Sequence, residues 1–250
     1  MCYFGPDCDG GWYSLIYIIT ERSNASGSMD QLFWLTSFPI ETKIKAPHPS
    51  EGWKHRGCSG IGREQVSQLI FDPDELRAIR TGKFPDFKES FDLGSEDSQT
   101  LPNNWIPDKD LPGFQTYATK FYNTCREFQL SILLPALALG LDLPKDFFLG
   151  YHEANENQLR LLHYPGAPTR VFERDCVVQY RDFLIRWSND TLKSTLHRVR
   201  APPVRDDQGD DGTTKEIFSM AYDYEKTIEC LPGCSGPDKP KKYEPIKTGE

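Results

Sequence analysis

Histidine is the side chain of this sequence that could most readily carry metal or acid-base chemistry. The five histidines are His48, His55, His152, His163 and His197. None is followed two positions later by Asp or Glu, and no pair has the H-E-x-x-H spacing of a helical zinc site. The sequence also has no G-x-S-x-G nucleophile elbow and no G-x-G-x-x-G phosphate loop after a strand. Spacing alone therefore predicts no complete metal site, no serine hydrolase and no dinucleotide site.

Cysteines could supply metal ligands or disulfides, but their number and spacing favour neither. The seven cysteines, at positions 2, 8, 58, 125, 176, 230 and 234, form no C-x-x-C pair. Cys230 and Cys234 are close enough for a metal-binding loop, but no second pair completes such a site. An odd, scattered set is typical of reduced thiols, which indicates a cytoplasmic protein.

The most informative segment for function lies between Arg186 and Val199 and reads RWSNDTLKSTLHRV. It resembles the C-terminal motif W-S-N-x-x-x-K-S-x-x-H-R-V of the iron(II)/2-oxoglutarate oxygenases related to isopenicillin N synthase. In that family the histidine of the motif is the last iron ligand. The resemblance therefore implies that His197 is a ligand of Fe(II).

Further segments resemble the same family, especially its fungal members, and come in the expected order. The N-terminal matches are HRGCSGIGRE at 55–64, DFKESFDLG at 86–94 and NWIP at 104–107. A central helix that contains Phe121 follows, then RLLHYP at 160–165, which is similar to the first strand of the catalytic barrel. CLP at 230–232 and KYEPI at 242–246 resemble the C-terminal extension. The resemblance covers nearly the whole chain.

The resemblance implies Fe(II) and 2-oxoglutarate as cofactors. In the family, a 2-His-1-carboxylate triad holds Fe(II) and leaves three positions for 2-oxoglutarate and dioxygen. An Arg and a Ser two residues apart grip the distal carboxylate of the oxo-acid through charge-assisted hydrogen bonds. Alignment places Ser219 at the serine of this clamp, and Tyr164 where a hydroxyl reaches the oxo-acid. A packed barrel tyrosine is the alternative for Tyr164, and no residue is assigned as catalytic.

The sequence departs from the family pattern at the iron site and at the clamp for the distal carboxylate of 2-oxoglutarate. The first two iron ligands normally form an H-x-D, with several tens of residues between the Tyr-Pro segment and the last motif. Here only twenty residues separate Pro165 from Arg186, and they contain no histidine. Ile217 stands where the arginine of the clamp belongs, with Arg205 and Lys215 as the nearby cations. A single imidazole is a poor iron site because chelation is lost. We therefore expect a truncated chain without its H-x-D block, which puts its activity in question.

The elements that position these residues divide into a helical half and a strand-rich half. Apolar residues recur at three- and four-residue steps from Phe114 to Leu134, which predicts a long amphipathic helix. A second short helix is expected from Pro144, and a glycine-rich loop from Pro47 to Gly62. The predicted strands cover 12–19, 158–164, 176–180, 196–199 and 217–222, and a short helix is expected from Ser28.

Composition limits the classes of partner. The 250 residues are 38% hydrophobic and 26% charged, as in an ordinary globular chain. A net charge of −8 repels nucleic-acid phosphates and anionic lipid. The longest apolar stretch, 130–143, is shorter than the roughly 20 residues of a membrane span. We expect a small-molecule substrate, no nucleic acid and no membrane.

These observations predict a mixed α/β (α+β) fold with an incomplete double-stranded β-helix, or jelly-roll, core and an α-rich N-terminal region. Residues 1–112 are expected to form the N-terminal region, and 113–250 the central helix with the truncated oxygenase domain. The resemblance implies a non-heme iron(II)/2-oxoglutarate-dependent oxidoreductase that acts on a small molecule in fungal secondary-metabolite biosynthesis. The alternative is a non-catalytic relative that binds a metabolite or, through exposed barrel edges, another chain.

Overall fold

The computed structural model describes residues 38–51, 54–63, 88–152, 157–166, 168, 177–179, 183–191, 197–199, 217–223 and 227–247. The strand expected at 12–19 and the helix expected from Ser28 lie outside these residues. So do the two cations near the clamp, Arg205 and Lys215.

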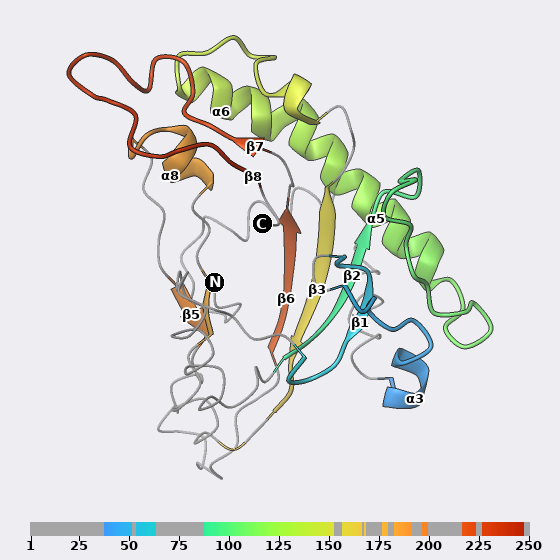
Figure 1. Ribbon diagram of the computed structural model, residues 1–250. Coiled ribbons are helices and arrows are strands. Elements are labelled where there is room, and N and C mark those ends of the chain that lie inside the picture. The colour runs from blue at the N-terminus through green and yellow to red at the C-terminus, as the bar shows by residue number, and fades with distance from the viewer. Residues whose placement is uncertain are drawn as a thin grey trace, which may run out of the picture.

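A four-stranded antiparallel sheet is the central element of the described structure (Figure 1). Its order is β1-β2-β3-β6, with β1 at Gly57–Ser59, β2 at Glu89–Gly94, β3 at Gln158–Tyr164 and β6 at Ile217–Asp223. Two short ribbons are separate from it. One pairs β4 (Val177–Gln179) with β5 (His197–Val199), and the other pairs β7 (Thr227–Ile228) with β8 (Ile246–Lys247).

A long helical segment runs along the side of the sheet that lies away from β5 (Figure 1). It consists of α5 (Phe114–Phe128), a π-helical turn (Gln129–Leu133) and α6 (Leu134–Gly140). The shorter helices are α3 (Ile40–Lys43), a 3-10 turn at Leu149–His152 and α8 (Phe183–Trp187). None of the described helices has both the length and the apolar character that crossing a bilayer requires.

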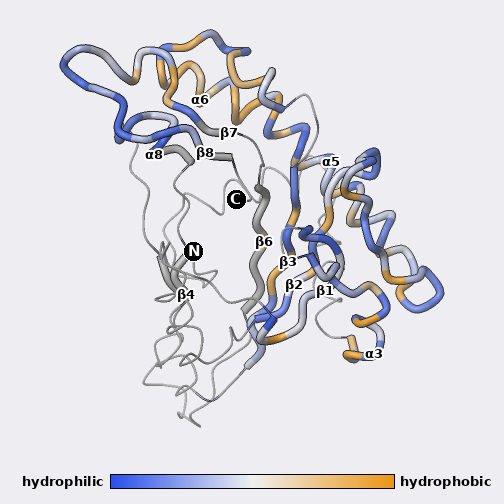
Figure 2. The backbone as a smooth tube through the Cα atoms, viewed as in Figure 1, coloured by the Kyte–Doolittle hydropathy of each residue, from blue (hydrophilic) through white to orange (hydrophobic). Residues whose placement is uncertain are grey.

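Two apolar clusters hold these layers together. The larger one packs α5 against β2 and β3 and includes Phe91, Leu93, Phe121, Leu159 and Leu161. The smaller one joins α6, the 3-10 turn and α8 through Leu134, Ala138, Phe148, Trp187 and Leu231. Figure 2 shows apolar residues concentrated along α6, and polar residues along the loop beside α8. Each cluster buries one stripe of the long helix, as its periodicity requires.

The structure agrees with several of the predicted elements. The strand expected at 158–164 is β3, and those expected at 176–180, 196–199 and 217–222 match β4, β5 and β6 within one or two residues. The mixed helix and sheet composition agrees with the expected fold class.

The long helix expected over 114–134 continues to Gly140, one of the two places where the sequence signals its end. A π turn accommodates Pro135, which has no N–H to donate to the helical ladder. Two local predictions were wrong. The segment from Pro144 forms turns and then a 3-10 turn instead of an α-helix. The expected loop at 47–62 contains β1, whose residue Gly57 has a φ of 76° and lies against the carbonyl of Ala46, where a Cβ would clash.

Candidate functional site

The two residues expected to contact 2-oxoglutarate lie on neighbouring strands. Tyr164 ends β3 and is opposite Ile217 of β6, while Ser219 is opposite Leu162. The side chain of Tyr164 is buried, with 2% of its surface exposed. The antiparallel register therefore brings positions 164 and 219 to the same end of the β3–β6 pair.

His197, the expected iron ligand, is on a different ribbon. It begins β5 and is opposite Gln179 of β4. Figure 1 shows β5 apart from the four-stranded sheet, on the side where β6 forms the edge. The structure thus places the backbone of His197 beyond β6 and does not bring it into the sheet with Tyr164 and Ser219.

A histidine-carboxylate cluster that the sequence did not predict lies at the other end of the sheet. His48, His55 and Asp92 have potential ligand atoms that all lie within 4.8 Å of one another. Asp92 is in β2 and is fully buried. Hydrogen bonds between the backbones of His48 and Cys58, and of Cys58 and Ala46, hold the histidine loop against β1. The two imidazole rings meet edge to face, with centroids 5.5 Å apart.

Arginine side chains already occupy this cluster. Arg160 of β3 donates from Nε to Asp92 Oδ1 at 2.6 Å and from Nη2 to Oδ2 at 3.3 Å. The same Nη2 lies 2.9 Å from His55 Nδ1, and Arg63 Nη2 lies 3.1 Å from His48 Nδ1. Ser90 and Gln158 add a hydrogen bond each to the Asp92 carboxylate.

This cluster does not fit Fe(II). Metal binding requires neutral imidazoles and carboxylate oxygens with free lone pairs. Here the Arg160 guanidinium uses lone pairs of both Asp92 and His55, and its positive charge opposes a second cation at the same place. We conclude that the guanidinium is the cation of this cluster. Sequence spacing gives no signal for it, because the two histidines come from a loop and the carboxylate from a strand.

Cys58 and Cys125 are poor candidates for a nucleophile. Cys58, Cys125, Cys230 and Cys234 are free thiols, in agreement with the expectation of reduced cysteines. Burial raises the pKa of Cys58 and of Cys125 to about 12, so both stay protonated at neutral pH.

The RWSND part of the motif, residues 186–190, is hydrogen-bonded to a segment near the C-terminus. The Asn189 side chain donates to the carbonyls of Cys234 and Pro240, at 3.1 and 3.0 Å, and accepts from the Lys242 amide at 2.9 Å. Asp190 accepts hydrogen bonds from the Tyr243 hydroxyl and from Lys242. Residues 186–191 are therefore fastened to the segment 230–243, which we call the C-terminal clasp.

Comparison with known proteins gives a consistent family. No protein-family model matches the chain. The chain is 31% identical to the 2-oxoglutarate-dependent dioxygenase htyE of Aspergillus rugulosus, in an alignment that covers 82% of the chain and 77% of the relative. It is 33% identical to the proline hydroxylase buaE of Petromyces alliaceus, over 82% of the chain and 75% of the relative.

Solved structures agree with these relatives. A full-length Neurospora crassa protein, crystallised in complex with alpha-KG and thymine, is 28% identical, with a TM-score of 0.70, and the match covers 92% of this chain and 80% of that one. A 2OG-Fe(II) oxygenase family protein from Caulobacter crescentus, 20% identical, shares the fold with a TM-score of 0.63 over 97% of this chain and 85% of that one.

The alignments also leave positions of the relatives without a counterpart in this chain. The alignment with the Aspergillus protein extends over 258 positions, although only 82% of the 250 residues take part in it. Roughly fifty positions of the relative therefore have no counterpart here, and the alignment with buaE, over 253 positions, gives a similar number. With identity above 30% over three quarters of these relatives, the chain belongs to the 2-oxoglutarate- and Fe(II)-dependent dioxygenases.

Proposed function

We propose that the protein oxidises a small molecule of fungal secondary metabolism, with 2-oxoglutarate as co-substrate and Fe(II) as metal. The observation that carries this proposal is the RWSNDTLKSTLHRV motif in a chain that aligns with fungal dioxygenases over most of its length. A relative named as a proline hydroxylase and the thymine-bound Neurospora protein support a small polar substrate. A cytoplasmic location stays a prediction.

For the site, we propose His197 as an iron ligand, and Tyr164 and Ser219 as contacts of 2-oxoglutarate. The register of β3 and β6, which brings positions 164 and 219 close along the sheet, supports the two oxo-acid contacts. Ile217, opposite Tyr164, cannot pair with a carboxylate, so the clamp needs a cation from elsewhere in the chain.

We further propose that the jelly roll is incomplete and that the missing positions fall between Pro165 and Arg186. The roughly fifty unmatched positions of the relatives and the absence of histidine from this interval support this placement. The division into residues 1–112 and 113–250 is supported by the start of α5 at Phe114. Sequencing the transcript across the codons for Pro165 to Arg186 tests the proposal, because an additional segment with H-x-D there would restore both ligands.

A non-catalytic role is the second candidate. The comparisons favour the catalytic role, and one observation motivates the alternative: Arg160 fills the histidine-carboxylate cluster of the described residues, so that cluster offers His197 no second iron ligand. Such a protein would bind a metabolite without turning over 2-oxoglutarate, or pair with another chain through the edge of its sheet.

Equilibrium dialysis of the full chain with 2-oxoglutarate, with and without Fe(II), distinguishes the two functions, and succinate release is measured in parallel. The oxygenase proposal predicts metal-dependent binding that His197→Ala removes and the matched variant His48→Ala retains. Metal-independent or absent binding by the folded protein would contradict it and favour the non-catalytic role.

A further inference from the structure

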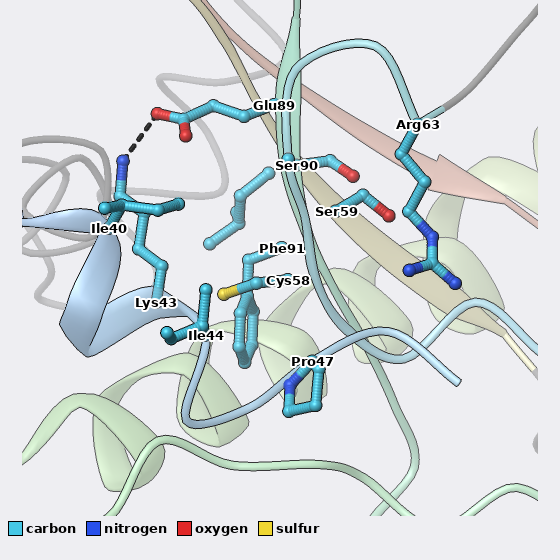
Figure 3. Close-up of a pocket in the computed structure, with 12 residues that line it drawn as sticks. Ile40, Lys43, Ile44, Pro47, Cys58, Ser59, Arg63, Glu89, Ser90 and Phe91 are labelled. Carbon is cyan, nitrogen blue, oxygen red and sulfur yellow. Dashed lines mark hydrogen bonds and ion pairs between the residues drawn. The ribbon is translucent and has the colours of Figure 1, made fainter. Parts of the chain in front are cut away.

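A cavity of about 180 Å³ lies between α3 and the sheet, on the face of β3 that carries Leu161. Tyr164, three residues further along the strand, points to the opposite face. Figure 3 shows its walls. Ile40 of α3, Ile44 directly after this helix, and Pro47 form one side. Cys58 of β1, Phe91 of β2 and Leu161 of β3 belong to the other. An apolar cavity of about 150 Å³ already accommodates a benzene molecule, so this space is large enough for one aromatic ring.

The two sides of the cavity differ in how they meet solvent. Phe91 and Leu161 are core residues, with 1% and 3% of their surface exposed. Ile40 and Ile44 are 52% and 60% exposed. A ligand in the cavity would therefore cover apolar surface of α3 that water now contacts, which is the main source of free energy for binding a small apolar molecule.

One end of the cavity is polar and carries a buried ion pair. Lys43 Nζ and His163 Nδ1 lie 2.6 and 2.7 Å from the same oxygen, Oε1 of Glu89. Burial alone would raise the pKa of Glu89, but the hydrogen bonds from His163 and Lys43 outweigh it and hold the pKa below its ordinary value. Glu89 is therefore a carboxylate at neutral pH.

The second oxygen of Glu89 is available to a ligand. Among the described residues, the hydrogen bonds to this carboxylate go to Oε1. In Figure 3 the other oxygen is directed toward the apolar side chains of the cavity. Lys43 and Glu89 cancel in charge, and Arg63, the other charged residue of the lining, places Nη2 at His48 Nδ1 and the Pro49 carbonyl. A charged ligand would therefore bring an uncompensated charge into apolar surroundings, whereas a neutral ligand would not.

We propose that this cavity is a binding site for a small neutral aromatic compound with one hydroxyl or N–H group. The ring lies between Ile44 and Phe91, and the donor pairs with Oε2 of Glu89. The site requires neither iron nor 2-oxoglutarate, so it stands independently of the oxidation proposed above. It is an accessory site on the side of the sheet that packs against the helices.

Calorimetric titration of the full chain with phenol tests the proposal, with toluene as the matched probe that lacks the donor. We expect saturable binding of one phenol per chain and at least tenfold weaker binding of toluene. Ile44→Trp fills the cavity from an exposed position and should weaken phenol binding at least tenfold. Leu139→Trp places the same ring at an exposed position on α6 and should leave binding unchanged.

Three results would overturn the site. They are the absence of saturable phenol binding by the folded chain, an unchanged affinity in Ile44→Trp, and equal affinities for phenol and toluene. Circular dichroism of each variant shows whether it is folded, and Glu89→Gln, which keeps the shape of the side chain, provides a second test. In that variant the preference for phenol over toluene should fall.

Discussion

Arg160 and Asp92 face each other directly across β3 and β2 and form a buried ion pair, with 2.6 Å between Nε and Oδ1. The Asp92 side chain is fully buried, and 14% of the Arg160 side chain is exposed. Because a shift of register by one residue would place the two groups on opposite faces of the sheet, the pair favours a single alignment of the two strands. The same guanidinium reaches His55 and so also fixes the loop that precedes β1.

Arg160→Met should destabilise the protein strongly. It leaves the Asp92 carboxylate buried without its cation, and loss of one partner of a buried pair costs about 3–5 kcal/mol. Urea denaturation measures the change. Lys45→Met, which removes a half-exposed ion pair with Asp110, should cost less than about 1 kcal/mol. If the two substitutions lowered the free energy of unfolding by the same amount, the buried pair would contribute no more to stability than the half-exposed one.

Zinc should not bind at His48, His55 and Asp92 in the natural chain. The expected result is that Zn(II) changes the melting temperature of the wild type and of His48→Ala by the same amount, because Arg160 excludes the ion. In Arg160→Gln the ligands become available, and Zn(II) should then raise the melting temperature. His48→Ala/Arg160→Gln should lose that gain. If Zn(II) raised the melting temperature of the wild type but not of His48→Ala, the Arg160 guanidinium would not exclude the metal from this cluster.

Stability should depend on the ionisation of Glu89 at acid pH. Its pKa is below the ordinary value of 4.5 in the folded protein, so its contribution is present above about pH 4.5 and is lost as the pH falls through the folded pKa. The difference in urea midpoint between wild type and Glu89→Gln should therefore narrow from pH 6 to about pH 3.5. Glu127→Gln, an exposed change on α5, should give a small difference that changes less with pH. A constant difference for Glu89→Gln would contradict the assigned role of Lys43 and His163.

Asn189 should hold the C-terminal clasp through its side chain. Its three hydrogen bonds to backbone groups are worth about 1 kcal/mol each. Its φ of 48° is in the left-handed region, where alanine is strained and glycine is not. Asn189→Gly should therefore lose about 2–4 kcal/mol, and Asn189→Ala about 1 kcal/mol more. Both variants should be cleaved faster by trypsin after the exposed residues Lys241 and Lys242. An unchanged cleavage rate would show that Asn189 does not hold this segment.

Elements with a strong local pattern could be predicted from the sequence, and elements that depend on distant partners could not. The short strand-like run 158–164 and the helical period from Phe114 predict β3 and α5 from the segments themselves. Strand β2 has no comparable signal, because Glu89 and Asp92 are charged residues that become compatible with a buried strand only when Lys43, His163 and Arg160 pair with them. Family resemblance proposes His197, Tyr164 and Ser219 as site residues, whereas the cluster of His48, His55 and Asp92 arises from long-range packing.

The clasp around Asn189 also has a consequence for the order of events during protein synthesis. The backbone partners of Asn189 lie 45 to 53 residues further along the chain. At about 5–20 residues per second, the ribosome makes them about 2 to 10 seconds after Asn189 itself. During that interval Trp187 lacks Leu231, its later-made neighbour in the smaller apolar cluster. The packing of residues 186–191 against the clasp is therefore completed only after residues 230–243 have been made.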